Sequence, residues 1–285
     1  MSKTIDSDVL KGYNAGIEKN RLRIGLGLIE FERTKELLLE FLPPPKTTEQ
    51  TPAIIYDIGG GYGEYSWWLS SLGYEVHLFD ISETNIKMSG NLKTEYPHTA
   101  LHSSEVADAR NIRRPTESAD AILFMGPLYH ITEKSERLFA LNECRRLLKP
   151  EGKLFSAAIT RFATILWATT VYGKSNSLLE ENAFIEMCES ELKNGEHIKP
   201  ANSEYRGMGH SHFHSPHELE NELSEAGFFE TCIHGVVGGG WLVPDIDERW
   251  KDETAKKAIM RSVRLLDKEK DILGLSTHLL AVSKK

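Results

Sequence analysis

Apolar runs that favour β-strands alternate with helix-forming segments through most of this 285-residue chain. The predicted strands are residues 53–57, 75–80, 101–107, 119–125, 153–159, 230–237 and 279–282. In other segments the apolar residues recur every three or four residues, which is the spacing of a helix. The predicted helices are residues 9–42, 65–72, 83–96, 134–148, 163–172, 178–192, 215–227 and 254–270. Strands that alternate with such helices are typical of a parallel sheet covered by helices on both faces and joined by right-handed crossovers. The alternation therefore predicts an α/β fold.

The composition narrows the kind of partner that the chain can bind. The chain has 34 Lys and Arg against 42 Asp and Glu, a formal charge of −8. This charge disfavours nucleic acid, because affinity for phosphate backbones comes mostly from a basic surface. No run approaches the roughly 18 consecutive apolar residues of a membrane span, and residues 1–11 lack the order of an export signal. We therefore expect a cytoplasmic protein whose partner is a small molecule, without a nucleic-acid or membrane partner.

The three cysteines, Cys144, Cys188 and Cys232, are odd in number and far apart in the sequence. This spacing disfavours both a disulfide framework and a clustered zinc site. We expect each cysteine to be a small buried hydrophobe.

Three consecutive prolines, Pro43–Pro45, separate the first helical segment from the rest of the chain. Proline has no amide hydrogen and disfavours helix in the residue before it, so the first helix ends here. We expect residues 1–45 to form a helical lid and residues 46–160 the core. Residues 161–214 are too long for an ordinary connection, which predicts an insertion over the substrate site. Residues 215–285 should complete the sheet and include a helical excursion.

A glycine-rich segment, Asp57-Ile58-Gly59-Gly60-Gly61-Tyr62-Gly63, joins the first core strand to a helix. Glycines let the backbone approach a ligand closely, and a helix amino terminus presents free amide hydrogens. The nicotinamide or flavin fingerprint needs a third glycine where this chain has Glu64 or Ser66, and the ending of a phosphate-binding Walker loop is absent. The loop is therefore a candidate ligand site, but it matches neither of these motifs.

The loop resembles the nucleoside-binding motif of class I S-adenosylmethionine-dependent methyltransferases, in which an acid precedes Gly-x-Gly-x-Gly. Asp80 stands where that family places the acid that holds the ribose hydroxyls, and Asp108-Ala109 resembles the pair that holds the adenine edge. Residues 126–130 resemble the methionine-lining segment of the ubiquinone/menaquinone-biosynthesis branch, and residues 147–154 resemble the passage into the fifth strand. These segments follow one another in the order that the family has.

The resemblance implies a seven-stranded Rossmann-like sheet whose last strand is antiparallel, with S-adenosylmethionine as the cofactor. In related small-molecule enzymes an amino-terminal helix covers the cofactor, and a tyrosine there meets the sulfonium region, which makes Tyr13 a candidate. The cofactor-binding residues that the resemblance implies are Asp57, Gly59, Gly61, Gly63, Asp80, Asp108, Ala109, Met125, Gly126, Tyr129 and Tyr13.

Histidines are the candidates for acceptor chemistry. His210, His212 and His214 alternate, so an extended segment places them on one face. Three such imidazoles could hold a metal, but we expect none here, because no carboxylate or cysteine completes the set nearby. We expect at least one of these three or His130 to bind the acceptor or remove its proton, since imidazole titrates near neutral pH. His217, in the first turn of the next helix, is expected to be structural.

The function that we expect is transfer of the methyl group of S-adenosylmethionine to a nitrogen or oxygen of a small-molecule acceptor. The reaction is an in-line displacement, so the protein aligns the two reactants, excludes water and, where needed, supplies a base. It requires no metal. Two alternatives stay open: a non-catalytic module that binds S-adenosylmethionine, and a nucleotide-dependent oxidoreductase, which the glycine spacing disfavours.

Overall fold

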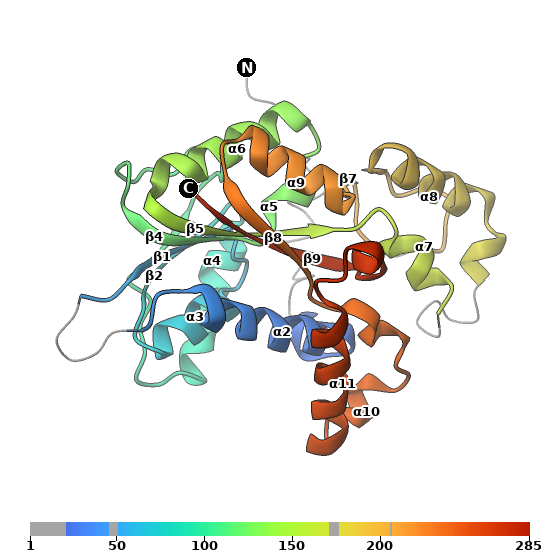
Figure 1. Ribbon diagram of the computed structural model, residues 1–285, viewed down its shortest axis with the longest axis horizontal. Helices are drawn as coiled ribbons and strands as arrows, with labels where there is room; N and C mark the ends of the chain where they lie inside the picture. The colour runs from blue at the N-terminus through green and yellow to red at the C-terminus, as the bar shows by residue number, and fades with distance from the viewer. Residues whose placement is uncertain (1–20, 46–50, 171–176, 206) are drawn as a thin grey trace.

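The structure is a computed structural model, and it describes residues 21–45, 51–170, 177–205 and 207–285. Its core is a seven-stranded sheet with the strand order β3-β2-β1-β4-β5-β9-β8 (Figure 1). The strands are β1 (Ile54–Ile58), β2 (Glu75–Asp80), β3 (Ser103–Val106), β4 (Ala119–Phe124), β5 (Leu148–Ile159), β8 (Phe229–Gly235) and β9 (His278–Lys284). Neighbours from β3 to β5 are parallel, whereas β9 is antiparallel to β5 and β8. The predicted fold class is confirmed, including the antiparallel last strand.

Both faces of the sheet are apolar and covered by helices. In the central strand β4, Ile122 and Phe124 belong to one apolar cluster, and Ala121 and Leu123 belong to the other. This division follows from the strand geometry, in which successive side chains point to opposite faces. The first face is covered by α6 (Lys134–Leu147) and α9 (Pro216–Glu225), and the second by α2 (Leu26–Phe41) and α3 (Glu64–Ser71) (Figure 1).

Two further parts of the chain lie beside the sheet. The first contains α7 (Ala163–Ala168), α8 (Asn182–Asn194) and the short hairpin of β6 (Glu196–His197) and β7 (Ser211–His212), at the right of Figure 1. The second lies between β8 and β9, where α11 packs on α2 through Val263 and Ile29. Its elements are η4 (Gly238–Leu242), α10 (Ile246–Arg249), α11 (Glu253–Leu266) and η5 (Lys270–Leu275).

Several elements differ from their predicted bounds. The segment predicted as one helix over residues 83–96 is α4 (Glu83–Ser89) followed by the 3-10 helix η2 (Gly90–Thr94). β5 begins five residues early, at Leu148, because that residue pairs with Ala119 before a register shift in the ladder. The described part of the N-terminal helix starts with η1 (Arg21–Arg23) and α2. Residues 1–20, which include Tyr13, lie outside the described residues.

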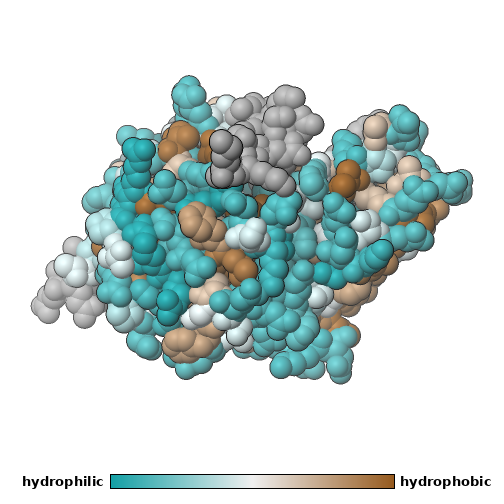
Figure 2. All heavy atoms as spheres, turned by 90° about the horizontal axis from the view of Figure 1, so that it is seen from above, coloured by the Kyte–Doolittle hydropathy of each residue, from teal (hydrophilic) through white to brown (hydrophobic). Residues whose placement is uncertain are grey.

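No described helix combines the length and hydrophobicity that crossing a bilayer needs. The face shown in Figure 2 is mostly hydrophilic, with small scattered hydrophobic areas. All three cysteines are free thiols; Cys144 and Cys188 are buried as predicted, whereas Cys232 is only half-buried.

Candidate active site

A cavity lies at the carboxyl ends of β1, β2 and β4. The strand order changes direction between β1 and β4, and ligands of open α/β sheets bind at such a switch point. The lining contains most of the predicted cofactor residues, namely Asp57, Gly59, Gly61, Asp80, Asp108, Ala109, Met125, Gly126 and Tyr129. Gly63 is not among the lining residues and instead precedes α3 as its N-cap. The segments that the resemblance singled out are thus close together in space.

The glycine loop leaves its backbone open to the cavity. Gly61 has a φ of +57°, and a Cβ added there would have no atom within 4 Å. Such a φ is unfavourable for residues with a side chain. Gly60 is constrained for a different reason, because its Cβ would lie 2.5 Å from the carboxyl group of Asp57 and from Leu78. The sequence motif treats Gly60 as a variable position, so this packing requirement was not predicted.

Asp57, at the end of β1, is a buried acid with one oxygen that has no hydrogen-bond partner. Its Oδ2 accepts a hydrogen bond from Ser66 Oγ at 2.6 Å, whereas Oδ1 has no partner within the described part of the chain. Burial raises the pKa of Asp57; the hydrogen bond from Ser66 opposes this, the negative charge of Asp80 adds to it, and the resulting pKa is about 7. A buried acceptor without a donor fits a ligand that brings a donor or a positive charge.

Asp80, at the end of β2, holds the glycine loop in place. Its Oδ2 accepts a hydrogen bond from the amide of Gly61 at 2.8 Å. Its Oδ1 accepts from the amide of Ser82 at 2.8 Å and from Asn85 Nδ2 at 3.1 Å. Each carboxylate oxygen has two lone-pair sites, so these bonds fill both sites of Oδ1, and the carboxylate as it stands cannot accept the two ribose hydroxyls that the resemblance implies. Asp80 therefore has a structural role that the sequence did not reveal.

Asp108, which lines the cavity after β3, is bound by a neighbouring arginine. Arg110 donates from Nε to Oδ1 at 2.9 Å and from Nη2 to Oδ2 at 2.6 Å. The same guanidinium donates from Nη1 to Glu136 Oε2 at 2.7 Å. Burial alone would raise the pKa of Asp108, but the hydrogen bonds and charge of Arg110 outweigh it and lower that pKa. Asp108 is therefore an ionised acceptor at the cavity wall.

The short helix α5 (Pro127–His130) supplies another part of the cavity lining. The hydroxyl of Tyr129 donates to the carbonyl oxygen of Met125 at 3.1 Å. Burial, together with the smaller effect of the positive charge of Arg21, lowers the pKa of His130 to about 4. His130 is therefore neutral at pH 7 and a weak proton acceptor, since the best general base has a pKa near the working pH.

Arg21 is a cavity residue that sequence reasoning did not identify. It lines the cavity, and its Nη1 donates to Glu30 Oε2 at 2.8 Å. The only signal in the sequence was the polar density of the segment around Arg21 and Glu30, which a solvated helix face also explains. The structure instead places a positive charge beside His130.

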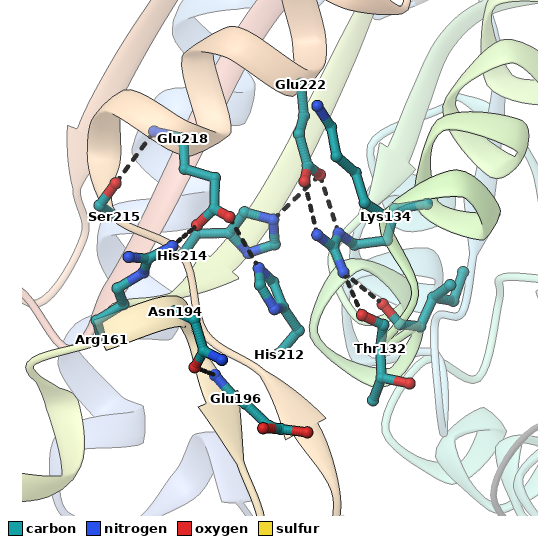
Figure 3. A network of polar contacts seen from close by, with 12 residues as sticks. Thr132, Lys134, Arg161, Asn194, Glu196, His212, His214, Ser215, Glu218 and Glu222 are labelled. Atoms are coloured by element: carbon teal, nitrogen blue, oxygen red, sulfur yellow. Dashed lines mark hydrogen bonds and ion pairs between the residues drawn. The ribbon is translucent and has the colours of Figure 1, made fainter. Parts of the chain in front are cut away.

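His210, His212 and His214 do not line the cavity. His214 Nε2 lies 3.3 Å from Glu222 Oε2, and His212 Nε2 lies 3.2 Å from Glu218 Oε1 (Figure 3). The expectation that no carboxylate lies near these histidines is therefore wrong. His212 and His214 are two residues apart in an extended segment, so their side chains lie on the same face of it. Glu218 and Glu222 are four residues apart in α9 and lie on the same face of that helix. Each histidine therefore meets one of the carboxylates.

These carboxylates are also bonded to arginines. Glu222 accepts from Arg137 Nε at 2.9 Å and from Nη2 at 2.6 Å, and Glu218 accepts from Arg161 Nη2 at 2.6 Å. Burial alone would raise the pKa of Glu222, but Arg137 and His214 outweigh it and lower that pKa to about 2. The group is thus a network of paired charges.

The network reaches the cavity only through the backbone. Arg137 is buried, and its Nη1 donates to the carbonyl oxygens of Ile131 at 3.1 Å and Thr132 at 2.7 Å. These residues directly follow His130. Of the four histidines proposed for the acceptor side, all of which the structure describes, only His130 lines the cavity. His217 is exposed and lies 3.1 Å from Asn221 Nδ2, as a structural role predicts.

Comparison with protein families finds a match to the part of the chain that forms most of this cavity. Residues 56–156, from β1 into β5, match the family model described as a methyltransferase domain. This segment of the chain is similar to a methyltransferase domain. This match confirms the predicted class of enzyme and its predicted cofactor, S-adenosylmethionine. No curated protein matches the chain.

Several solved structures have a similar fold over most of the length of this chain. An S-adenosylmethionine-dependent methyltransferase from Methanosarcina mazei is 18% identical, with 83% of this chain and 93% of that chain covered and a TM-score of 0.54. A protein from Pyrococcus horikoshii is 16% identical, with 96% and 98% covered and a TM-score of 0.58. A [4+2]-cyclase is 13% identical, with 100% and 97% covered and a TM-score of 0.58. Similarities at this level of identity establish the shared fold, which hosts more than one chemistry.

Proposed function

We propose that this chain transfers a methyl group from S-adenosylmethionine to a nitrogen or oxygen of a small-molecule acceptor. When bound, the cofactor supplies an electrophilic methyl group on a sulfonium. The observation that carries the proposal is the cavity itself, where a glycine loop and three acids from the ends of successive strands surround one space. These acids are Asp57, Asp80 and Asp108, and a ligand with a positive charge and several hydroxyl and amine donors suits such a lining.

The protein's own residues would act by binding and alignment. Asp57 Oδ1, which has no donor in the described part of the chain, would face a cationic or N–H group of the ligand. Gly61 leaves space for the ligand beside the loop. Alignment of donor and acceptor in a water-poor cavity is sufficient for a displacement of this kind.

The acceptor side of the cavity is proposed to lie toward α5 and the N-terminal helix. Neutral His130 would hydrogen-bond the acceptor, and Arg21 would make this side positive. Residues 161–214 are proposed to cover it, because Phe213 packs in one cluster with Tyr129, which lines the cavity. The proposal does not extend to a quinone precursor, since only the segment Gly126–His130 supports that branch. A small-molecule acceptor, rather than nucleic acid, agrees with the charge of −8. The reaction is proposed to take place in the cytoplasm.

The test is a transfer assay with methyl-labelled S-adenosylmethionine and a panel of small amines, phenols and hydroxy acids. The proposal predicts label in at least one acceptor, and no label with the Gly61→Val variant. Cofactor binding without transfer to any acceptor class would favour the non-catalytic module instead. Reduction or oxidation of a nicotinamide would support the oxidoreductase and overturn the proposal.

A further inference from the structure

A second group of chemistry-bearing side chains lies at the opposite end of β2 from the cavity. Glu75 begins β2 and His77 follows it on the same face, while His102 directly precedes β3. One ligand atom from each of the three lies within 4.8 Å of the others. Glu75 is five residues from Asp80, a distance of about 16 Å at roughly 3.3 Å per strand residue. The group is therefore separate from the methyltransferase site.

The spacing of the three side chains suits a tetrahedral metal ion. Glu75 Oε1 lies 3.3 Å from His77 Nε2 and 3.6 Å from His102 Nδ1. A tetrahedral zinc ion with bonds of about 2.0–2.1 Å has ligand atoms roughly 3.4 Å apart. Both imidazoles thus approach one carboxylate oxygen at the distances that a shared ion would set.

Hydrogen bonds around Ser103 fix the orientation of His77. Arg114 Nη2 donates to Ser103 Oγ at 3.1 Å. Ser103 Oγ in turn lies 2.9 Å from His77 Nδ1, within hydrogen-bond distance. This contact turns the other ring nitrogen, Nε2, toward Glu75 Oε1. A hydrogen bond at the ring nitrogen away from the ion is how metal-binding histidines are oriented.

Access and charge also favour an ion here. His102 is 56% exposed and Glu75 25% exposed, so an ion can enter from solvent, whereas His77 is almost buried. Arg114, whose positive charge acts on His77, is paired with Glu105. Glu75 thus supplies a negative charge that no described arginine or lysine neutralises within the ion-pair distance.

The described chain has another cluster of histidines and a carboxylate, but the carboxylate there is already neutralised. His212, His214 and Glu222 also bring their ligand atoms within 4.8 Å. However, Glu222 is already bound by both Arg137 nitrogens, and Arg161 binds the adjacent Glu218. A divalent cation placed there would meet two buried or half-buried guanidinium groups, which repel it. Figure 3 shows how these charges are already paired.

We propose that Glu75, His77 and His102 form a binding site for a divalent transition-metal ion such as Zn²⁺. Two imidazoles and one carboxylate leave the fourth position of a tetrahedral ion for water. The ion would join β2 to the start of β3, a strand of only four residues that leads to Asp108. Metal binding should therefore stabilise this edge of the sheet.

The test is calorimetry and thermal unfolding of the tag-free, chelator-treated full chain with ZnCl₂. The proposal predicts one Zn²⁺ per chain and a rise in the melting temperature. His102→Ala and Glu75→Gln should each weaken binding at least tenfold, and Ser103→Ala should weaken it by about 10–100-fold, the usual cost of removing a group that orients a ligand. His98→Ala, which removes an exposed histidine outside the cluster, should leave affinity unchanged.

Two results would overturn the proposal. One is the absence of Zn²⁺ binding at millimolar concentration, which would mean that a proton alone occupies the space between His77 and Glu75. The other is binding that persists in His102→Ala and Glu75→Gln. Binding that is instead lost in Glu222→Gln would place the ion in the other cluster and equally refute this site.

Discussion

Replacement of Asp57 by asparagine should stabilise the folded protein at neutral and alkaline pH while weakening cofactor binding. The side chain is 1% exposed, and one of its oxygens has no donor in the described part of the chain. Asparagine keeps the shape and can still accept the hydrogen bond from Ser66. What it removes is the cost of holding a negative charge in a buried position.

The magnitude follows from the pKa of Asp57. In the unfolded chain the carboxyl group has its ordinary pKa of 3.8, and in the folded protein it has a pKa of about 7. Between these values only the folded protein holds the proton, so the stability falls as the pH rises. At roughly 1.36 kcal/mol per pH unit, the loss is about 4 kcal/mol and is complete above pH 7.

His130 obscures this trend in the wild type. Its pKa is about 4 in the folded protein against an ordinary value of 6.5. Between these values the unfolded chain holds more protons, so His130 makes the stability rise with pH, by about 3 kcal/mol. The two effects oppose each other from pH 4 to 6.5. The observable must therefore be the difference between variant and wild type, from which His130 cancels.

The assay is denaturant unfolding of the wild type and Asp57→Asn at intervals from pH 4.5 to 8. The difference in the free energy of unfolding should shift by about 3 kcal/mol in favour of the variant over this range, which covers most of the interval between the two pKa values. An Asp271→Asn variant, which removes an exposed carboxylate, serves as the control. In Asp57→Asn, loss of the charged acceptor should also weaken cofactor binding by about 1.5–3 kcal/mol. Stability curves that stay parallel across the whole pH range would refute the reasoning.

Three further outcomes follow from the same structure. Gly61→Val should abolish cofactor binding in calorimetry yet keep the circular dichroism spectrum of a folded protein, because its side chain would enter the open space beside the loop; retained binding would contradict this. Glu222→Gln should lower the free energy of unfolding by about 3–5 kcal/mol, because it leaves Arg137 buried without its paired charge, and a loss below about 1 kcal/mol would rule this out. Hydrogen exchange in residues 161–214 should slow when cofactor and acceptor are added, and unchanged rates would argue against their proposed role as a cover.

The strands and the cavity were predictable because their signals are local. β2 and β4 are short apolar runs that end at a turn, and the acids Asp57 and Asp80 stand at strand ends, which parallel pairing brings to one edge of the sheet. β3 was weak in the sequence because it is an edge strand whose residues alternate between half-buried and exposed.

The features that were missed depend on contacts between distant segments. No local pattern pairs His214 with Glu222, since the pairing needs both the turn into α9 and its orientation against β7. Arg21 carries only a diffuse polar signal until η1 places it in the lining of the cavity, near His130. The Glu75 and His102 contact likewise requires β2 and β3 to be neighbours in register.

The central claim is that the cavity at the ends of β1, β2 and β4 binds S-adenosylmethionine, and calorimetric titration of the demethylated cofactor tests it most directly. The titration should use the wild type and an Asp80→Asn variant, whose amide cannot serve all the donors that the carboxylate now accepts. The account predicts one bound molecule per chain and an affinity at least tenfold weaker in the variant, about 1.4 kcal/mol. Absence of binding by the wild type, or equal affinity in the two proteins, would contradict it.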